Sequence, residues 1–134
     1  MRYVLDANIA VAALNGVGPV RQRLSMVTLD EVGIPLVALA ELLFGAYKSM
    51  RREDNLQRIA TLRRTVMVLP LTDRIVDRYG AVRAALESGG TRKSDFDLLI
   101  ACTALDLDAI LVTHDRDLLD GSIVGLETED WLRT

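Results

Sequence analysis

Cysteine and histidine are almost absent from this chain, which has only Cys102 and His114. A single cysteine cannot form an intramolecular disulfide, and one thiol with one imidazole cannot supply the four ligands of a structural zinc ion. Catalysis by paired histidines is also excluded. We expect Cys102 to be a small core residue in a protein of a reducing compartment, and His114 to orient a loop or face solvent.

Long apolar runs and aromatic residues are scarce as well. No run is long enough to cross a membrane, and the run at residues 9–14 is shorter than a usual signal-peptide core. Only 4% of the 134 residues are aromatic although 50% are hydrophobic, so Ala, Val, Leu and Ile must build the core. We therefore predict a single cytoplasmic domain over residues 1–134 that needs no membrane.

An excess of positive charge is missing too. The formal net charge is −3, which argues against a general basic surface for nucleic acid. Basic residues nevertheless gather in three places, each of which is most simply explained as a solvated helix face. These groups are Lys48 with Arg51 and Arg52, Arg63 with Arg64, and Arg92 with Lys93.

What the chain does contain is an alternation of short β-branched runs with helical stretches, which predicts an α/β fold with a mainly parallel sheet of four or five strands. Strands are expected at residues 3–5, 34–37, 66–69 and 109–113, with a short fifth near Leu126. Helices are expected at 8–15, 19–26, 38–50, 53–64, 72–88, 94–106 and 116–119. Parallel strands end at one edge of the sheet, where we expect the chemistry to lie.

Four acidic residues lie beside apolar segments and would reach this edge: Asp6, Glu41, Asp97 and Asp115. Asp97 joins the others only if the stretch at residues 87–93 brings the chain back to the same edge. Each close pair of carboxylates would repel by roughly 3 kcal/mol at an effective dielectric of about 20. A divalent metal ion is the cation that we expect among them.

Each acid also has a purely structural interpretation. Asp6 and Asp115 could cap the helices that follow them, a role worth about 1 kcal/mol. Asp97 lies three residues after Ser94, as in a capping box. Glu41 is the hardest to explain in this way, because its neighbours at helical spacing cannot pair with a carboxylate.

The segments LDANI, AELLFGAYKS, DFDLLIACTAL, LVTHDRDL and GLETEDW, in this order, resemble the PIN-domain ribonucleases, most closely the VapC toxins of bacterial toxin–antitoxin pairs. The resemblance covers nearly the whole chain and implies a PIN-like three-layer sandwich. It places the family's acidic cluster on Asp6, Glu41, Asp97 and Asp115, with Asp117 as an outer helper. Ala7 departs from the family, which often has a hydroxyl residue there to help hold the metal shell.

The resemblance implies an endoribonuclease in which Mg²⁺ or Mn²⁺ activates a water for in-line attack on phosphorus. Asp6 and Asp97 would bind the main ion directly, and Glu41 and Asp115 would complete its shell. Products would carry 5′-phosphate and 3′-hydroxyl ends. The implied partners are an RNA substrate, a VapB-type antitoxin that covers the site, and a second copy of the chain in a homodimer.

Apolar surface for such contacts is expected around residues 43–47, although we expect two of Leu43, Phe44 and Tyr47 to belong to the core. Two other functions stay open. One is a non-catalytic PIN-like binding module with a structural metal. The other is a metal-dependent phosphatase or phospho-acceptor domain, which would want adjacent acids after the first strand and a lysine near the last, and LDANI and LVTHD supply neither.

Overall fold

A five-stranded sheet forms the centre of the computed structural model, which describes residues 1–133. The strand order is β3-β2-β1-β4-β5, and every neighbouring pair is parallel. The strands are β1 (Tyr3–Leu5), β2 (Val32–Pro35), β3 (Met67–Leu69), β4 (Ile110–Val112) and β5 (Thr128–Glu129). The predicted parallel α/β sheet is confirmed. Thr134, the last residue of the predicted domain, lies outside the described residues.

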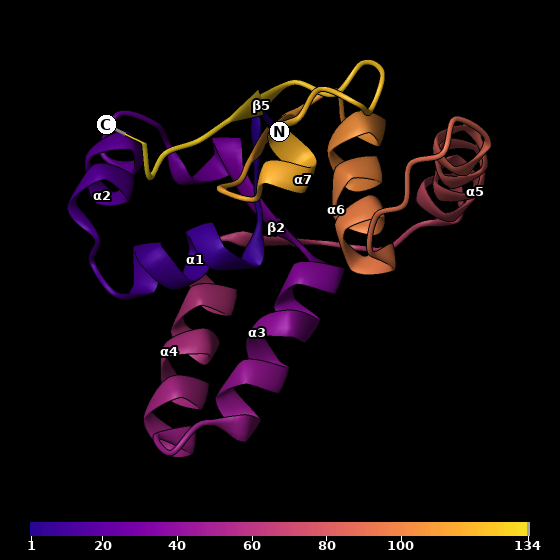
Figure 1. The fold of residues 1–134 in the computed structure, drawn as a ribbon. Coiled ribbons are helices and arrows are strands. Elements are labelled where there is room, and N and C mark those ends of the chain that lie inside the picture. Colours follow the sequence, from indigo (N-terminus) through magenta and orange to yellow (C-terminus); the bar gives the residue numbers. More distant parts are fainter. Residues whose placement is uncertain (134) are drawn as a thin grey trace.

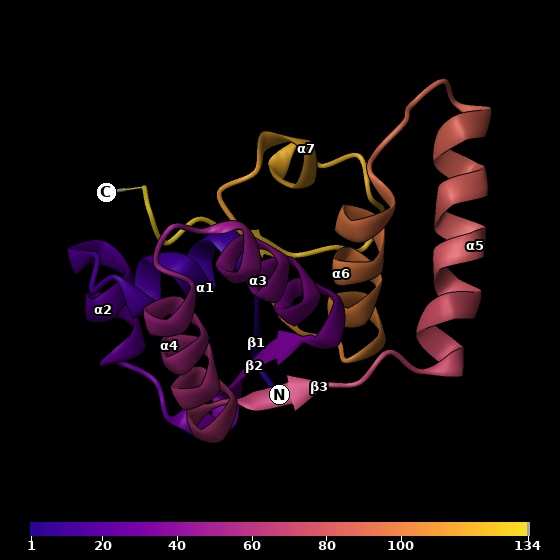
Figure 2. The same cartoon turned by 90° about the horizontal axis from the view of Figure 1, so that it is seen from below.

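Seven α-helices flank this sheet, with a short 3-10 helix at Leu29–Glu31 that the sequence pattern did not predict. They are α1 (Ala7–Leu14), α2 (Gly18–Leu24), α3 (Leu36–Lys48), α4 (Arg52–Thr65), α5 (Asp73–Ser88), α6 (Asp95–Asp106) and α7 (Arg116–Leu119). Helices α3 and α4 form a hairpin that projects from the sheet (Figure 1). Helix α6 packs beside the sheet, and α5 lies on the outer side of α6 (Figure 2).

Each face of the sheet is covered by its own apolar cluster, because side chains alternate along a strand. Val4 of β1 packs into the cluster that holds α3, α4 and α6. Tyr3 and Leu5 point to the other cluster, which contains Ile9 of α1 and the buried ring of Trp131. The result is the three-layer sandwich that the resemblance implied.

Strand β2 begins and ends two residues earlier than predicted, and the prediction that it extends to Val37 is wrong. The strand ends at Pro35, which has extended dihedral angles and serves as the N-cap of α3, so Leu36 and Val37 are helical. Proline has no N–H to donate to a sheet ladder, and its ring restricts φ, so it ends the strand there. This early start places Glu41 in the second turn of α3. The fifth strand also lies two residues beyond Leu126.

Helix α3 leaves part of its surface exposed. The expectation that two of Leu43, Phe44 and Tyr47 belong to the core is wrong, because Phe44 is 68% and Tyr47 57% exposed. Only Leu43 packs against the core. Leu36, on the same face as Phe44, is 46% exposed. Within residues 1–133, no helix has the length and apolar character needed to span a membrane.

Candidate active site

Asp6 lies directly after β1 and is only 4% exposed. It is the N-cap of α1, and its Oδ1 accepts a hydrogen bond of 2.7 Å from the amide of Ala7. The capping role expected from the sequence is thus confirmed. Its second oxygen, Oδ2, remains available to a partner from another strand.

That partner is Thr113, a fully buried residue at the end of β4 that the sequence analysis missed. Its Oγ1 donates to Asp6 Oδ2 at 2.8 Å and accepts from the Asp115 amide at 3.0 Å. One hydroxyl therefore connects the carboxyl ends of β1 and β4. The segment LVTHD places a polar β-branched residue between an apolar strand and an acid, and this pattern could have identified Thr113.

Asp115 is the N-cap of α7, and its Oδ1 accepts from the Asp117 amide at 2.9 Å. The Asp117 side chain is exposed. The side chain of Lys93, which is 2% exposed, donates to the Asp117 carbonyl and to Asp120 Oδ2, the latter at 2.9 Å. Lys93 thereby attaches the segment before α6 to the helix that Asp115 caps.

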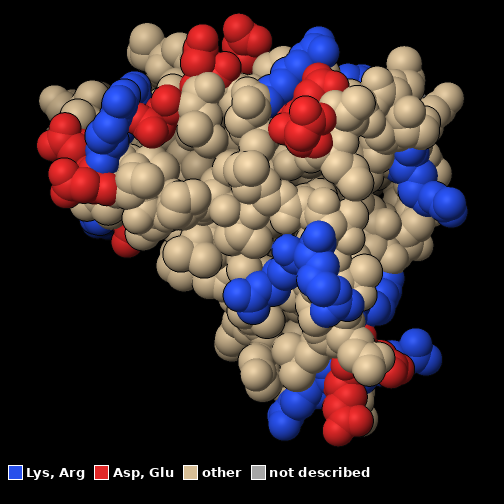
Figure 3. Space-filling model, turned by 180° about the vertical axis from the view of Figure 1, so that it is seen from behind, with Lys and Arg blue, Asp and Glu red and all other residues tan. Residues whose placement is uncertain are grey.

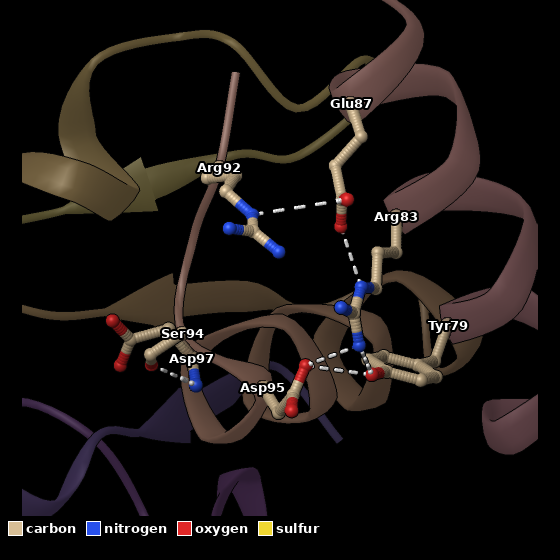
Figure 4. A network of polar contacts seen from close by, with 7 residues as sticks. All are labelled: Tyr79, Arg83, Glu87, Arg92, Ser94, Asp95 and Asp97. Carbon is tan, nitrogen blue, oxygen red and sulfur yellow. Dashed lines mark hydrogen bonds and ion pairs between the residues drawn. The ribbon is translucent and has the colours of Figure 1, made fainter. Parts of the chain in front are cut away.

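Asp97 lies in the first turn of α6, and its amide donates to Ser94 Oγ at 3.1 Å. This turn is braced by α5 through a polar network (Figure 4). Tyr79 Oη and Arg83 Nη1 donate to Asp95 Oδ1 at 2.7 and 2.9 Å, and Arg83 Nε donates to Glu87 at 2.6 Å. These contacts hold the start of α6 in place next to α5.

Glu41 projects from α3 and is partly buried. Burial raises its pKa, and the charges of Asp6, Asp97 and Asp115 raise it further. No ion pair among residues 1–133 includes Glu41 or any of those three aspartates. Helix α3 does carry Lys48 in its last turn, but this lysine forms no ion pair with Glu41.

The four carboxyl groups form one electrostatic unit. Burial raises the pKa of Asp97 to about 6, with additional repulsion from Asp115 and Asp6 and an opposing hydrogen bond from Ser94. Burial also raises the pKa of Asp6, and Asp115 adds to this, while bonds from Thr113 and Ala7 oppose it. Every pair among the four acids is thus coupled, so the stretch at residues 87–93 does return Asp97 to the edge where the other three lie.

Comparison with known proteins decides the family. The model of the PIN domain matches residues 3–122. The chain belongs to the PIN-domain family. It is 32% identical to Ribonuclease VapC1 of Haemophilus influenzae, over 99% of this chain and all of that protein. It is also 32% identical to the tRNA(fMet)-specific endonuclease VapC of Shigella flexneri, over 98% of each chain.

Solved structures of VapBC complexes also resemble this chain. The VapBC2 complex of Rickettsia felis bound to promoter DNA contains a chain with a TM-score of 0.87 and 30% identity, covering 98% of this chain and 99% of that one. A DNA-bound VapBC of Salmonella typhimurium matches with a TM-score of 0.89 and 26% identity, covering 98% of both chains. The predicted resemblance is therefore confirmed over nearly the whole chain.

The acidic edge of this PIN domain offers only hard oxygen donors. In the described part of the chain, no three His, Cys, Asp or Glu side chains are grouped closely enough to hold one metal ion. Oxygen donors suit Mg²⁺ and Mn²⁺, and Mg²⁺ usually binds through one or two carboxylates while keeping several waters. The donor chemistry therefore fits a hydrated divalent ion better than a closed protein cage.

The two singular residues of this PIN domain take no part in the acidic edge. The exposed His114 ring contacts Asp130 Oδ2 through Nδ1 at 2.8 Å, toward the C-terminal segment. Cys102 is fully buried in α6, and burial raises the pKa of its thiol to about 11, against a small opposing effect of Arg78. The expectations of a solvent-facing histidine and a core cysteine are both confirmed.

The hydrogen bond from Thr113 to Asp6 can be tested directly by mutation. Ala7, which follows Asp6, has no hydroxyl that could replace it. Replacing Thr113 with valine should remove the hydroxyl at nearly constant volume and leave a buried carboxyl without one partner. We expect a loss of about 1–3 kcal/mol in the free energy of unfolding, measured by urea denaturation. The Thr113→Ser variant keeps the hydroxyl and should lose less; equal losses in both variants would contradict the role of this bond.

Proposed function

We propose that this chain is a Mg²⁺- or Mn²⁺-dependent endoribonuclease, the toxin of a VapBC-type pair, with its catalytic and metal-binding residues at Asp6, Glu41, Asp97 and Asp115. The observation that carries this proposal is the coupling of four carboxyl groups at one sheet edge without a basic partner in residues 1–133. A carboxylate cluster of this kind repels itself unless a cation binds to it.

The chain's own residues have distinct tasks in this proposal. Asp6, immobilised by the α1 cap and by Thr113, and Asp97, set in the first turn of α6, would bind the ion directly. Glu41 and Asp115 would bind through water or complete the shell, with Asp117 outside them. When bound, the ion would supply the Lewis acidity that activates water for hydrolysis of the phosphodiester.

An RNA substrate is compatible with the surface despite the net charge of −3. On the face in Figure 3, basic side chains gather near the middle, whereas several acidic ones lie along the upper margin. At the bottom of that view, side chains of both signs lie close together. The end of α3 carries Lys48, and the first turn of α4 carries Glu53. Arg92 and Lys93 pair with Glu87 and Asp120, so they are engaged within the protein.

Two protein partners follow from the same proposal. The chains of similar structure come from VapBC toxin–antitoxin complexes, which supports a VapB-type antitoxin as a partner. A homodimer is supported by the large apolar residues that α3 exposes, Leu36, Phe44 and Tyr47, because exposed apolar surface often marks a protein contact. We propose the cytoplasm as the compartment where both partners meet.

The test is the chemistry of the RNA ends. Purified protein is incubated with RNA and Mn²⁺, and the new ends are analysed; 5′-phosphate and 3′-hydroxyl ends are expected, and cleavage should stop in EDTA or in the Asp6→Asn variant. Ends with a 2′,3′-cyclic phosphate would contradict the mechanism. RNA that is bound but left intact would favour the binding module, and release of inorganic phosphate from phosphomonoesters would favour the phosphatase.

A further inference from the structure

A pocket of about 400 Å³ opens beside the acidic edge, between α1, α3 and α4. Glu41 belongs both to this pocket and to the four-carboxylate unit. The other polar lining residues are Asn8, Asn15, Asn55 and Arg58. The pocket is therefore continuous with the site where we place the chemistry, and it contains one cation that the proposed reaction has not yet used.

Arg58 is that cation, and its charge is not neutralised within the described chain. Its Nη2 donates to the Leu14 carbonyl and to Asn15 Oδ1, the latter at 2.9 Å. Among residues 1–133, no carboxylate forms an ion pair with it, and no hydrogen bond comes from its Nε or Nη1. Nε and Nη1 therefore each remain available to donate a single hydrogen bond to a phosphate oxygen, and the guanidinium keeps its positive charge.

Glu41 and Arg58 line the same pocket without forming an ion pair. In residues 1–133, the cation and the acidic edge therefore share one cavity without neutralising each other. This arrangement suits a polynucleotide, in which one phosphate can lie at the acidic edge while a neighbouring phosphate binds the guanidinium.

We propose that this pocket is a subsite for the nucleotide adjacent to the cleaved bond, with Arg58 binding the flanking phosphate of a single-stranded RNA. This assignment rests on the proposed ribonuclease function. Asn8 and Asn55 supply amides for a ribose hydroxyl or a base edge, and the apolar wall includes Val11, which is 41% exposed. No aromatic residue lines the pocket, so the subsite recognises the nucleotide without stacking on a ring.

The first test fills the pocket from α3. Gly45 lines it, and a Cβ built on Gly45 would meet no atom within 4 Å, so Gly45→Leu adds a side chain without a clash at Cβ. Gly80 in α5 is equally open and lies outside the pocket, which makes Gly80→Leu a matched control. Both variants replace a helical glycine and should unfold at higher temperature than the wild type. Only Gly45→Leu should raise KM for a short fluorescein-labelled single-stranded RNA, by about tenfold, with a smaller change in kcat.

The second test removes the charge. Arg58→Gln should raise KM for the same RNA and reduce the slope of log KM against log salt by about 0.7, the value for one phosphate contact on a single strand. Arg63→Gln removes an exposed charge from the same helix and should leave the slope unchanged. Loss of a merely structural contact to Leu14 would lower thermal stability but would not change the salt slope.

The outcomes separate this inference from the function on which it rests. If the wild type fails to cleave RNA, the proposed function fails and the subsite with it, before any variant is made. If the wild type cleaves, and Gly45→Leu and Arg58→Gln match their controls in KM and salt slope, only the subsite is wrong. Unchanged RNA kinetics combined with weaker binding of a partner protein would assign the pocket to that protein and would also overturn the inference.

Discussion

Replacing Asp97 with asparagine is expected to lower RNA cleavage by roughly 10³-fold, because the proposed site would lose a direct ligand of its ion. The same change should stabilise the metal-free protein. Burial and repulsion from Asp115 and Asp6 raise the pKa of Asp97 to about 6, so its charge is unfavourable in the folded state at neutral pH. After allowance for solvent screening we expect a gain of about 1 kcal/mol, or about 3 °C in Tm.

The control for this experiment is Asp73→Asn. Asp73 is an exposed acid in the first turn of α5, as Asp97 is in the first turn of α6, but it lies outside the acidic cluster. It should change neither kcat/KM nor the Tm in EDTA by a comparable amount. Full activity of Asp97→Asn would remove Asp97 from the proposed site. An unchanged or lower Tm in EDTA would show that its carboxylate is not under the repulsion described above.

The second large effect should come from the metal ion itself. At about pH 7, Mn²⁺ at a hundred times its dissociation constant should stabilise the wild type by about 2.7 kcal/mol, which corresponds to roughly 8 °C in a chain of this size. Thermal unfolding in EDTA and in Mn²⁺ measures the difference. The Asp97→Asn variant should lose most of this gain. KCl at equal ionic strength is the control, because simple screening would act without a binding site.

The pH dependence of this stability has a definite sign. The folded-state pKa of Asp97, about 6, lies above the ordinary value of 3.8 for an aspartate, so the folded state binds the proton more tightly. Its stabilising contribution is therefore complete below about pH 3.8 and is lost as the pH rises through about 6. Asp6 and Glu41, whose pKa values are also raised, act in the same direction.

The Tm advantage of Asp97→Asn over the wild type in EDTA should consequently grow between about pH 4 and about pH 7, and saturating Mn²⁺ should abolish or reverse it. Taking the difference between the two proteins cancels groups of opposite sign, such as Asp120, whose pKa is lowered to about 2 by hydrogen bonds from Ser122 and Lys93. A difference that is constant with pH would mean that Asp97 does not titrate in this range.

Local sequence was sufficient for most of the elements. Strand β1 and helix α7 have the predicted bounds, and α6 begins one residue after the predicted start, since Ser94 is its cap. The main error is the position of β2: Val37 is β-branched and fits a strand by propensity, but Pro35 ends the strand and caps α3.

The acids themselves were recognisable because each one stood beside apolar residues, and Glu41 had no local partner. The contacts that organise them were not, since each joins residues far apart in the chain. The bond from Thr113 to Asp6 spans 107 positions, and that from Lys93 to Asp120 spans 27. Arg58 reaches Asn15 across 43 positions. No pattern within a single helix or strand contains such pairs.

By itself, the sequence determined the parallel α/β class, the family and the four acidic positions, because periodicity, motif order and unpartnered charge are properties of local segments. Only the tertiary structure decided that all four carboxyl groups share one edge, that Thr113 connects two of their strands, and that Arg58 faces a pocket next to Glu41. These features depend on distances between segments, which are set when both faces of the sheet bury their apolar side chains at once.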